Sequence, residues 1–397
     1  MRALILSLLV ILCWSPALGH CQTLIAPIGS STTTDATESK EENKKDEDKE
    51  KDKKDKRRPG EIVVSTAVEG LNNPFSIAVD GDANRIFVAE SGAQRIVEIK
   101  NGKAVEIAGE FPASTFRGYQ AGPLSLFAAG ENVLLVGHDD EKGVGSITKL
   151  TEASDAKDEP GKDKAKPKFE RETVAIENPG GATLGKFSNL MVKHTMVYAV
   201  THGDDENGWI AVSEIKDEKL TTLRPSIPTA KRSSYPGPTC ATVSPAGEYL
   251  VVSQMGDDKN AKDSRLVFYT LQGKMLRNFE VELNDIVALA YSPGRKHLFA
   301  IDYNFSDPTK GGLYKLIGKG ADKCDIKKLQ DVSYATSMVF DSKGTLWITT
   351  LGGPPSTDGK PNGKVIKIEG LDDSPESIED AEDADEEDAE DAKESGK

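Results

Sequence analysis

Only four cysteines occur in the 397-residue sequence, which is too few for a scaffold held together by disulfides. No apolar run outside the N-terminus approaches the roughly 18 residues of a membrane-spanning helix, so none is expected in the mature chain. Basic residues are not in excess either, because 50 Lys and Arg face 65 Asp and Glu, a net charge of −15. Since binding to a phosphate backbone depends on a basic excess, no nucleic-acid partner is expected.

The charge that is present gathers near the two ends of the chain. Asp35–Arg58 holds ten acids and ten bases, and residues 372–397 hold fourteen acids and two lysines. Neither segment has enough apolar residues to offset the entropy lost on ordering. We therefore expect a disordered charged linker over residues 20–60 and a disordered acidic tail over residues 372–397. The stretch 61–371 between them is long enough to bury a sizeable core.

The first nineteen residues have the pattern of a secretory signal peptide. Met1-Arg2 is a positive start, Ala3–Trp14 is a short apolar run, and Ala17-Leu18-Gly19 is a small-residue cleavage site. We expect cleavage near Gly19 and a secreted, periplasmic or cell-surface protein. Lipidation of Cys21 is the alternative, although His20 stands where a bacterial lipobox has a small residue.

A pattern of about fifty residues recurs six times in the middle of the chain. Each unit has a short β run, a turn and a stronger β run, as in Ser76–Asp80 followed by Arg85–Glu90. Equivalent positions, spaced by 49, 64, 51, 48 and 49 residues, are Val79, Ala128, Val192, Val243, Tyr291 and Phe340. The long interval contains the low-complexity insert Ala153–Lys168, and the period is restored when this insert is removed.

A third β run follows each pair, and a fourth follows in most units. Six such repeats without helical periodicity predict an all-β, six-bladed β-propeller of four-stranded antiparallel blades. The sixth unit has only three strands, and its unpaired edge would invite misassociation. We predict that Glu61–Val68 supplies the missing strand by pairing with Lys364–Glu369, so that residues 61–371 form one closed, monomeric domain.

The first unit resembles an NHL repeat. Asn73–Asp80, Ile86–Glu90 and Arg95–Ile99 follow that family's pattern of P-x-G-I-A-V-D, I-Y-V-A-D and N-x-R-I-Q-V. Ser76 stands where the family usually has Gly, and Glu90 where it usually has Asp; the other units keep mainly the hydrophobic pattern. The resemblance implies a propeller of the NHL-repeat and SMP-30-like superfamily. It does not imply one function, because such propellers include binding modules, lactonases and lyases.

Polar residues follow the second β run of each unit, where propeller loops gather around one rim of the central channel. The candidate ligand-binding residues on this rim are Glu90, His138, Asp139, His202, Asp204, Gln254, Asp257, Asp302 and Asn304. Two of the five histidines, His138 and His202, are expected there, and with nearby carboxylates they suit a divalent metal such as zinc. Carboxylates and carbonyls alone would suit calcium. The alternative is that these polar groups bond only to loop amides.

Aromatic residues are also expected near this rim, where they would suit a saccharide, a peptide or another small polar ligand, or pack between blades. They are Phe116, Tyr119, Phe187, Trp209, Tyr235, Tyr303, Phe305 and Tyr334.

No nucleophile triad is visible in the sequence. Our main hypothesis is therefore a secreted propeller that binds a ligand or a protein through its loop face, without recognisable catalytic apparatus. The alternative is a divalent-metal-dependent hydrolase or lyase, lactonase-like or amidation-lyase-like, at the channel rim. A third histidine for the lyase and a first-blade carboxylate for the lactonase are missing, so we lean away from an enzyme. A third hypothesis is a scaffold for cell-surface assembly, with both charged ends as tethers.

Two further patterns concern single residues. Cys240 begins an inner strand and Cys324 an outer strand of the next repeat, so no disulfide is expected between them. Asn304-Phe305-Ser306 matches an N-glycosylation acceptor.

Overall fold

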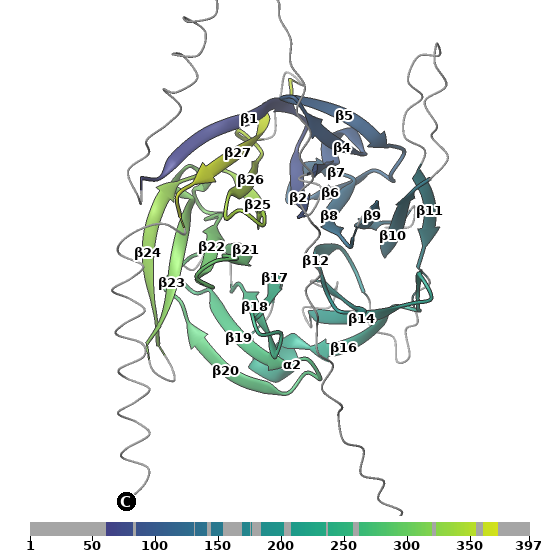
Figure 1. Ribbon diagram of the computed structural model, residues 1–397. Coiled ribbons are helices and arrows are strands. Elements are labelled where there is room, and N and C mark those ends of the chain that lie inside the picture. Colours follow the sequence, from purple (N-terminus) through teal and green to yellow (C-terminus); the bar gives the residue numbers. More distant parts are fainter. Residues whose placement is uncertain are drawn as a thin grey trace, which may run out of the picture. The chain divides into compact units, whose positions relative to one another are not determined.

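The computed structural model describes residues 61–371, without 82–84, 131, 141–143, 154–168, 175, 177–183, 202–207, 236, 257–261, 320–322 and 355–359. The predicted signal peptide, charged linker and acidic tail lie outside the described residues, as does most of the low-complexity insert. Six antiparallel sheets are arranged in a ring (Figure 1), which confirms the predicted all-β, six-bladed propeller. None of the described helices has the length and apolar character needed to cross a membrane.

The first three blades run outward from the channel in sequence order, except that in blade 3 both β15 and β16 pair with β14. Blade 1 contains β2 (Pro74–Asp80), β3 (Arg85–Glu90), β4 (Arg95–Lys100) and β5 (Lys103–Ala108). Blade 2 contains β8 (Pro123–Ala128), β9 (Val133–Asp139), β10 (Gly145–Glu152) and β11 (Phe169–Thr173). Blade 3 contains β12 (Phe187–Lys193), β13 (Met196–Thr201), β14 (Trp209–Lys216), β15 (Lys219–Leu220) and β16 (Arg224–Pro228).

Blades 4 and 5 repeat this arrangement with four strands each. Blade 4 contains β17 (Pro238–Val243), β18 (Tyr249–Gln254), β19 (Arg265–Thr270) and β20 (Met275–Glu280). Blade 5 contains β21 (Ile286–Tyr291), β22 (Leu298–Asp302), β23 (Gly312–Lys319) and β24 (Lys323–Asp331). The short helices between strands are η1 (Ser91–Ala93), α2 (Thr229–Ser233) and η2 (Pro308–Lys310).

Blade 6 closes the ring by joining the two ends of the described chain. Its inner strands are β25 (Ala335–Phe340), β26 (Leu346–Thr350) and β27 (Gly363–Glu369), and its outer strand is β1 (Val63–Leu71). The pairing of β1 with β27 runs from Val63 opposite Glu369 to Leu71 opposite Gly363. This confirms the predicted closure, which removes the exposed edge that a three-stranded last blade would have.

Every inner strand carries the same irregularity where it begins. Its register against the second strand shifts after the first residue, at Pro74/Ser76, Pro123/Ser125, Phe187/Asn189, Pro238/Cys240, Ile286/Ala288 and Ala335/Ser337. Such a bulge re-aims the extra side chain. In three blades the unpaired residue of the bulge is a Ser or Thr, and its hydroxyl donates to a backbone oxygen of the next blade. Ser188 Oγ donates to Thr239 O (2.7 Å), and Thr336 Oγ1 donates to Pro74 O (2.8 Å).

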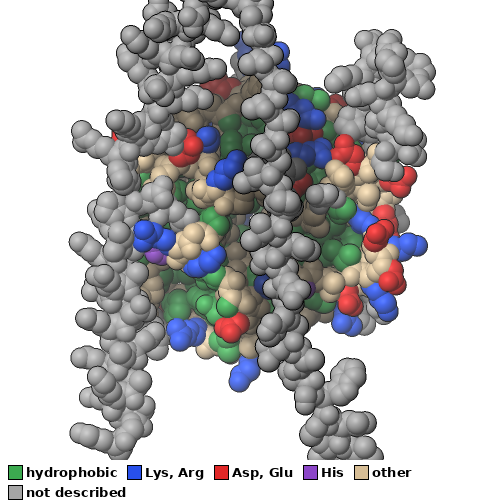
Figure 2. Space-filling model, in the orientation of Figure 1, with side chains coloured by type: hydrophobic (Ala, Val, Ile, Leu, Met, Phe, Trp, Pro, Cys, Tyr) green, Lys and Arg blue, Asp and Glu red, His purple; other side chains and the backbone are tan. Residues whose placement is uncertain are grey.

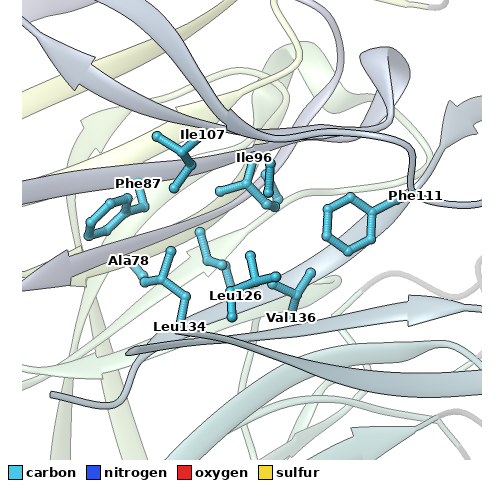
Figure 3. Packing of buried hydrophobic residues seen from close by; sticks show 11 residues of the cluster. Ala78, Phe87, Ile96, Ile107, Phe111, Leu126, Leu134 and Val136 are labelled. Atoms are coloured by element: carbon cyan, nitrogen blue, oxygen red, sulfur yellow. The ribbon is translucent and has the colours of Figure 1, made fainter. Parts of the chain in front are cut away.

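The hydrophobic core lies between neighbouring blades. Figure 3 shows the cluster between blades 1 and 2, where Phe87 and Ile96 face Leu134 and Val136. The Leu134 side chain is buried, and burying such a side chain stabilises a fold by roughly 1.5–3 kcal/mol.

An ion-pair cluster also joins blades 1 and 2. Arg85 bonds to Glu98 through Nε (2.9 Å) and Nη2 (3.1 Å), and Arg85 Nη1 reaches Glu152 of blade 2 (2.7 Å). Glu98 is almost fully buried. Burial alone would raise the pKa of Glu98, but hydrogen bonds from Arg85 and Lys100 outweigh it and lower the pKa. The pair therefore depends on both partners.

The two cysteines of the propeller are free, as predicted. Burial raises the pKa of the Cys240 thiol to about 12 and that of Cys324 to about 11, so both remain protonated thiols at neutral pH.

Candidate functional site

The loop face is the side of the ring where inner strands begin and second strands end. The second strands end at Glu90, Asp139, Thr201, Gln254, Asp302 and Thr350, all buried. Of the predicted site residues, Glu90, His138, Asp139, Gln254, Asp302 and Asn304 are described, whereas His202, Asp204 and Asp257 lie outside the described residues. On the side of the ring that Figure 2 shows, acidic and basic side chains are interspersed where no grey atoms cover them.

Glu90 and Asp302 hold loops of blades 1 and 5 in the same way. Glu90 Oε1 accepts from Asn72 N (2.8 Å), and Oε2 accepts from Arg95 Nε (2.6 Å). Asp302 accepts from the amides of Asn284 (3.3 Å) and Asp285 (2.8 Å). Each carboxylate thus fixes the loop that leads into its own inner strand, as expected of polar groups at strand ends.

Asn304 has a local role. Its Oδ1 accepts from Ser306 Oγ (2.6 Å) and Asp307 N (3.3 Å), and its backbone has φ 55°. Because the side chain is buried and its oxygen is used within the turn, glycosylation of this folded Asn would require the turn to open.

His138 lies between blades 1 and 2. Nδ1 bonds to Asp139 O (2.7 Å), and because a carbonyl only accepts, Nδ1 carries the proton. Nε2 bonds to Thr148 Oγ1 (2.8 Å), and the ring meets Phe111 edge-on at 5.3 Å. Burial lowers the pKa of His138, so the ring is neutral. A metal could bind only if one of these hydrogen bonds broke, and the described residues contain no cluster of three His, Cys, Asp or Glu side chains suited to a metal.

Asp139 differs from the other acids of the loop face. Alternate residues of a strand face opposite ways, so Asp139 lies on the side of β9 that faces blade 3, away from His138. Its side chain is 1% exposed, and neither carboxylate oxygen has a hydrogen-bond partner. Burial raises its pKa; the Ser114 hydroxyl, the Lys186 ammonium and His138 lower it less, and Asp140 raises it. The Ser114 hydroxyl is likewise buried without a partner in bonding geometry.

Gln254 contributes to blade 4. Its Nε2 donates to Tyr235 O (2.7 Å), while its buried Oε1 has no partner. The Tyr235 ring lies under the Arg265 guanidinium at 4.7 Å. Gln254 therefore positions the segment that carries Tyr235.

A hairpin between blades 1 and 2 covers the mouth of the channel, and nothing in the fifty-residue repeat predicted it. β6 (Ser114–Phe116) pairs with β7 (Tyr119–Ala121), and the turn residues Arg117 and Gly118 have φ 48° and 83°, as in a type I′ turn. The signal was present in the sequence: an Arg-Gly pair between short β-prone runs.

The hairpin contacts loops of five blades. Asn73 of blade 1 donates to Gln120 O (3.0 Å), and Lys186 beside blade 3 donates to Thr115 O (3.0 Å). On the other side, Arg117 Nη2 lies 3.6 Å from Met255 Sδ of blade 4. Tyr119 Oη bonds to Tyr303 Oη of blade 5 (3.3 Å) and to Gly353 O of blade 6 (3.3 Å). A segment that starts beside blade 2 and reaches all the others must span the channel mouth.

Apolar side chains, most of them aromatic, pack around Tyr119 of the hairpin, and we call them the mouth cluster. It consists of Tyr119, Tyr303 and Leu351, with Phe75, Val287, Phe305 and Tyr334 packed against them. The Arg117 guanidinium stacks on the Phe305 ring at 3.9 Å. Burial raises the pKa of Tyr303, so its hydroxyl stays protonated. Of the aromatic residues predicted on this face, Phe187 and Trp209 instead pack in the core between blades 2 and 3.

Comparison with known proteins supports the fold. No family model and no curated protein matches the chain. The PQQ-bound aldose sugar dehydrogenase of Streptomyces coelicolor superposes with a TM-score of 0.52 at 14% identity, covering 78% of this chain and 99% of that one. An oxidoreductase (glucose dehydrogenase) of Thermus thermophilus gives 0.54 at 15% identity, covering 78% and 100%. A gluconolactonase of Xanthomonas campestris gives 0.52 at 9% identity, covering 78% and 90%. The chain is thus a six-bladed β-propeller similar in fold to gluconolactonase-like and aldose sugar dehydrogenase propellers.

Proposed function

We propose that the protein binds a small carbohydrate-like molecule at the channel mouth, beside the hairpin. The observation that carries the proposal is the meeting of Tyr119, Tyr303, Phe305, Tyr334 and Arg117 at this one place. Aromatic faces stack on the apolar faces of sugar rings, and nearby hydroxyls and a guanidinium can bond to ring substituents. The sugar-processing propellers of similar fold support the same ligand class by analogy.

A second candidate function is hydrolysis of a sugar lactone. It is supported by the gluconolactonase of similar fold and by Asp139, a buried carboxyl with raised pKa beneath the hairpin. With the hairpin displaced, the Asp139 carboxylate would take a proton from a water molecule whose oxygen attacks the lactone carbonyl carbon. The ring C–O bond would then break, and the leaving alkoxide would take the proton back, giving a hydroxy acid.

The cofactors of such propellers do not fit the described residues as they stand. For a divalent metal, the described part of the chain contains no group of three suitable ligands. For PQQ, a flat molecule with several carboxylates, the cations that the structure places at the hairpin are Arg117, which stacks on Phe305, and Lys186, which donates to Thr115 O. We therefore derive no step through a metal or through PQQ.

The binding proposal is tested by thermal denaturation of the mature chain with D-glucose, D-gluconate and D-glucono-1,5-lactone. A ligand at 100 times its dissociation constant should stabilise the fold by about 2.7 kcal/mol. Arg117→Ala and Tyr334→Ala should each weaken binding by about tenfold, equivalent to about 1.4 kcal/mol. The exposed Arg224, on the outer strand of blade 3, provides the control Arg224→Ala. No shift with any sugar, or equal losses in the control, would contradict the proposal.

The hydrolysis candidate has a separate test. The lactone should open faster with protein than without, and Asp139→Asn should reduce the excess rate by roughly 100-fold or more. An opening rate equal to that of buffer would eliminate this candidate and leave the binding proposal in place.

For localisation we propose export after cleavage near Gly19, which rests on the sequence pattern alone. Sequencing the N-terminus of protein recovered from the native host tests it. An intact Met1 would contradict export, and a lipid-linked Cys21 would favour the lipoprotein alternative.

A further inference from the structure

We propose that the hairpin Ser114–Ala121 is a lid over the channel mouth, and that the charge on Asp139 controls whether the lid is open. Protonated Asp139 favours the closed lid, and ionised Asp139 favours the open one. The inference rests on the proposed function only for the identity of the site that the lid covers.

The closed position is held by contacts that can be released together. The polar attachments are hydrogen bonds from Asn73 and Lys186 and the Tyr119 contacts to Tyr303 and Gly353. Arg117 also packs on Met255 and Phe305, and Phe116 packs on Phe75. The hairpin pairs with no blade sheet; five residues separate it from β5 and Gly122 alone separates it from β8, so it would swing outward about Gly122. An isolated two-stranded hairpin is marginally stable in water, so its own ladder should open once it leaves the mouth.

The charge on Asp139 can control the lid because its carboxyl is buried without a hydrogen-bond partner. Beneath the closed lid the carboxyl is 1% exposed and has no hydrogen bond on either oxygen. A neutral carboxylic acid tolerates such a place, whereas an ionised carboxylate without a partner does not. Opening the lid moves away Ser114, whose hydroxyl acts on the carboxyl, and admits water. In the open state water therefore solvates the ionised Asp139 carboxylate, whereas in the closed state the carboxylate is buried without a partner.

Lys186 supplies the second half of the switch. In the closed state its ammonium donates to Thr115 O of the hairpin and lies 5.9 Å from the Phe116 ring. Once the hairpin leaves, that bond is lost, and the ammonium is free to turn to the carboxylate of Asp139. The same lysine thus holds the lid when Asp139 is neutral and stabilises the open state when Asp139 is charged.

The charged groups around Asp139 set the direction of the pH response. Those that act on it are Lys186 at the start of blade 3, His138 on β9 and Asp140 after β9. His138 is buried and neutral, and its ring nitrogens bond to Asp139 O and Thr148 Oγ1, not to the Asp139 carboxylate. Because burial raises the pKa of Asp139, the closed state is favoured at low pH, and this preference is lost as the pH rises through that pKa.

Amide hydrogen exchange of residues 114–121 tests the lid without any ligand. Exchange is compared at about pH 5 and about pH 8, each corrected for the intrinsic rate. We expect protection to fall by about tenfold or more at the higher pH in the wild-type chain. Asp139→Asn, which keeps the shape and removes the charge, should stay protected at both. Asp140→Asn removes a charge that raises the pKa of Asp139, so it should keep the pH response and shift it to lower pH.

Two outcomes would overturn the inference. One is equal protection of the wild-type hairpin at both pH values, and the other is an unchanged pH response in Asp139→Asn. Lys186→Gln gives a second check, since it removes the bond to Thr115 O and should lower hairpin protection already at about pH 5. A chain that passes these tests but binds no sugar would refute the proposed function and leave the lid standing.

Discussion

Replacing His138 separates a structural role from a metal-binding one. His138→Ala removes the hydrogen bonds to Asp139 O and Thr148 Oγ1, each worth about 1 kcal/mol. It also removes the edge-on contact with Phe111, worth about 0.5–1.5 kcal/mol. Together these predict a loss of about 3 kcal/mol in the free energy of unfolding. Thr148 keeps a partner in Thr173 at 3.2 Å, so no further penalty for an unpaired hydroxyl is added.

Urea denaturation followed by far-ultraviolet circular dichroism measures this loss. The control is His194→Asn, because His194 is exposed in the turn between β12 and β13 with φ 54°, which Asn tolerates. The control should lose almost nothing. A His138→Ala chain that unfolds like the wild type but has lost about one bound zinc per chain by elemental analysis would contradict the structural role of His138.

The same residue predicts a pH dependence. Burial lowers the pKa of His138 in the folded state, so the unfolded chain binds the extra proton first as the pH falls. The wild type should lose stability as the pH drops below about 6.5, the ordinary value for histidine. His138→Ala should lack this part of the loss, and the difference between the two chains should shrink toward low pH.

Three further changes test the stability of the propeller and of the hairpin. Arg85→Met leaves the buried Glu98 with Lys100 as its remaining cationic partner (2.9 Å) and should cost about 3 kcal/mol in urea at neutral pH, the low end for a broken buried pair. Because the pKa of Glu98 is lowered in the fold, this loss should shrink as the pH falls below about 4; a constant loss would contradict the ion-pair account. Gly118→Ala forces a side chain into φ 83° and should cost the hairpin about 1–2 kcal/mol, seen as faster exchange of its amides with an unchanged urea midpoint. Deleting residues 61–71 exposes the edge of β27 and should give aggregates in size-exclusion chromatography; a stable monomer would refute closure as a requirement.

The architecture could be predicted from the sequence because it depends on periodicity. The fifty-residue period and the three-stranded last unit were enough to predict six blades and the pairing of β1 with β27. Both follow from which residues alternate and how many strands each unit has.

The site could be predicted only as a neighbourhood. The residue types and the repeat placed Glu90, His138, Asp139 and Asp302 at strand ends, but they did not predict which groups these side chains contact. Strand alternation puts His138 and Asp139 on opposite sides of β9, and the contacts that distinguish them come from Phe111, Ser114 and Lys186 in other segments. The hairpin lies outside the repeat, so periodicity gave no sign of it, and its reach across the channel depends on tertiary packing.

Hydrogen exchange of the mature chain, with and without a saturating sugar from the binding series, shows whether ligand binds at the channel mouth beside the hairpin. We expect ligand to change exchange at residues 114–121 and around Tyr303, Phe305 and Leu351, and to leave the outer strands β5, β20 and β24 unchanged. Changes confined to the outer strands, with none at the mouth, would contradict binding at the mouth.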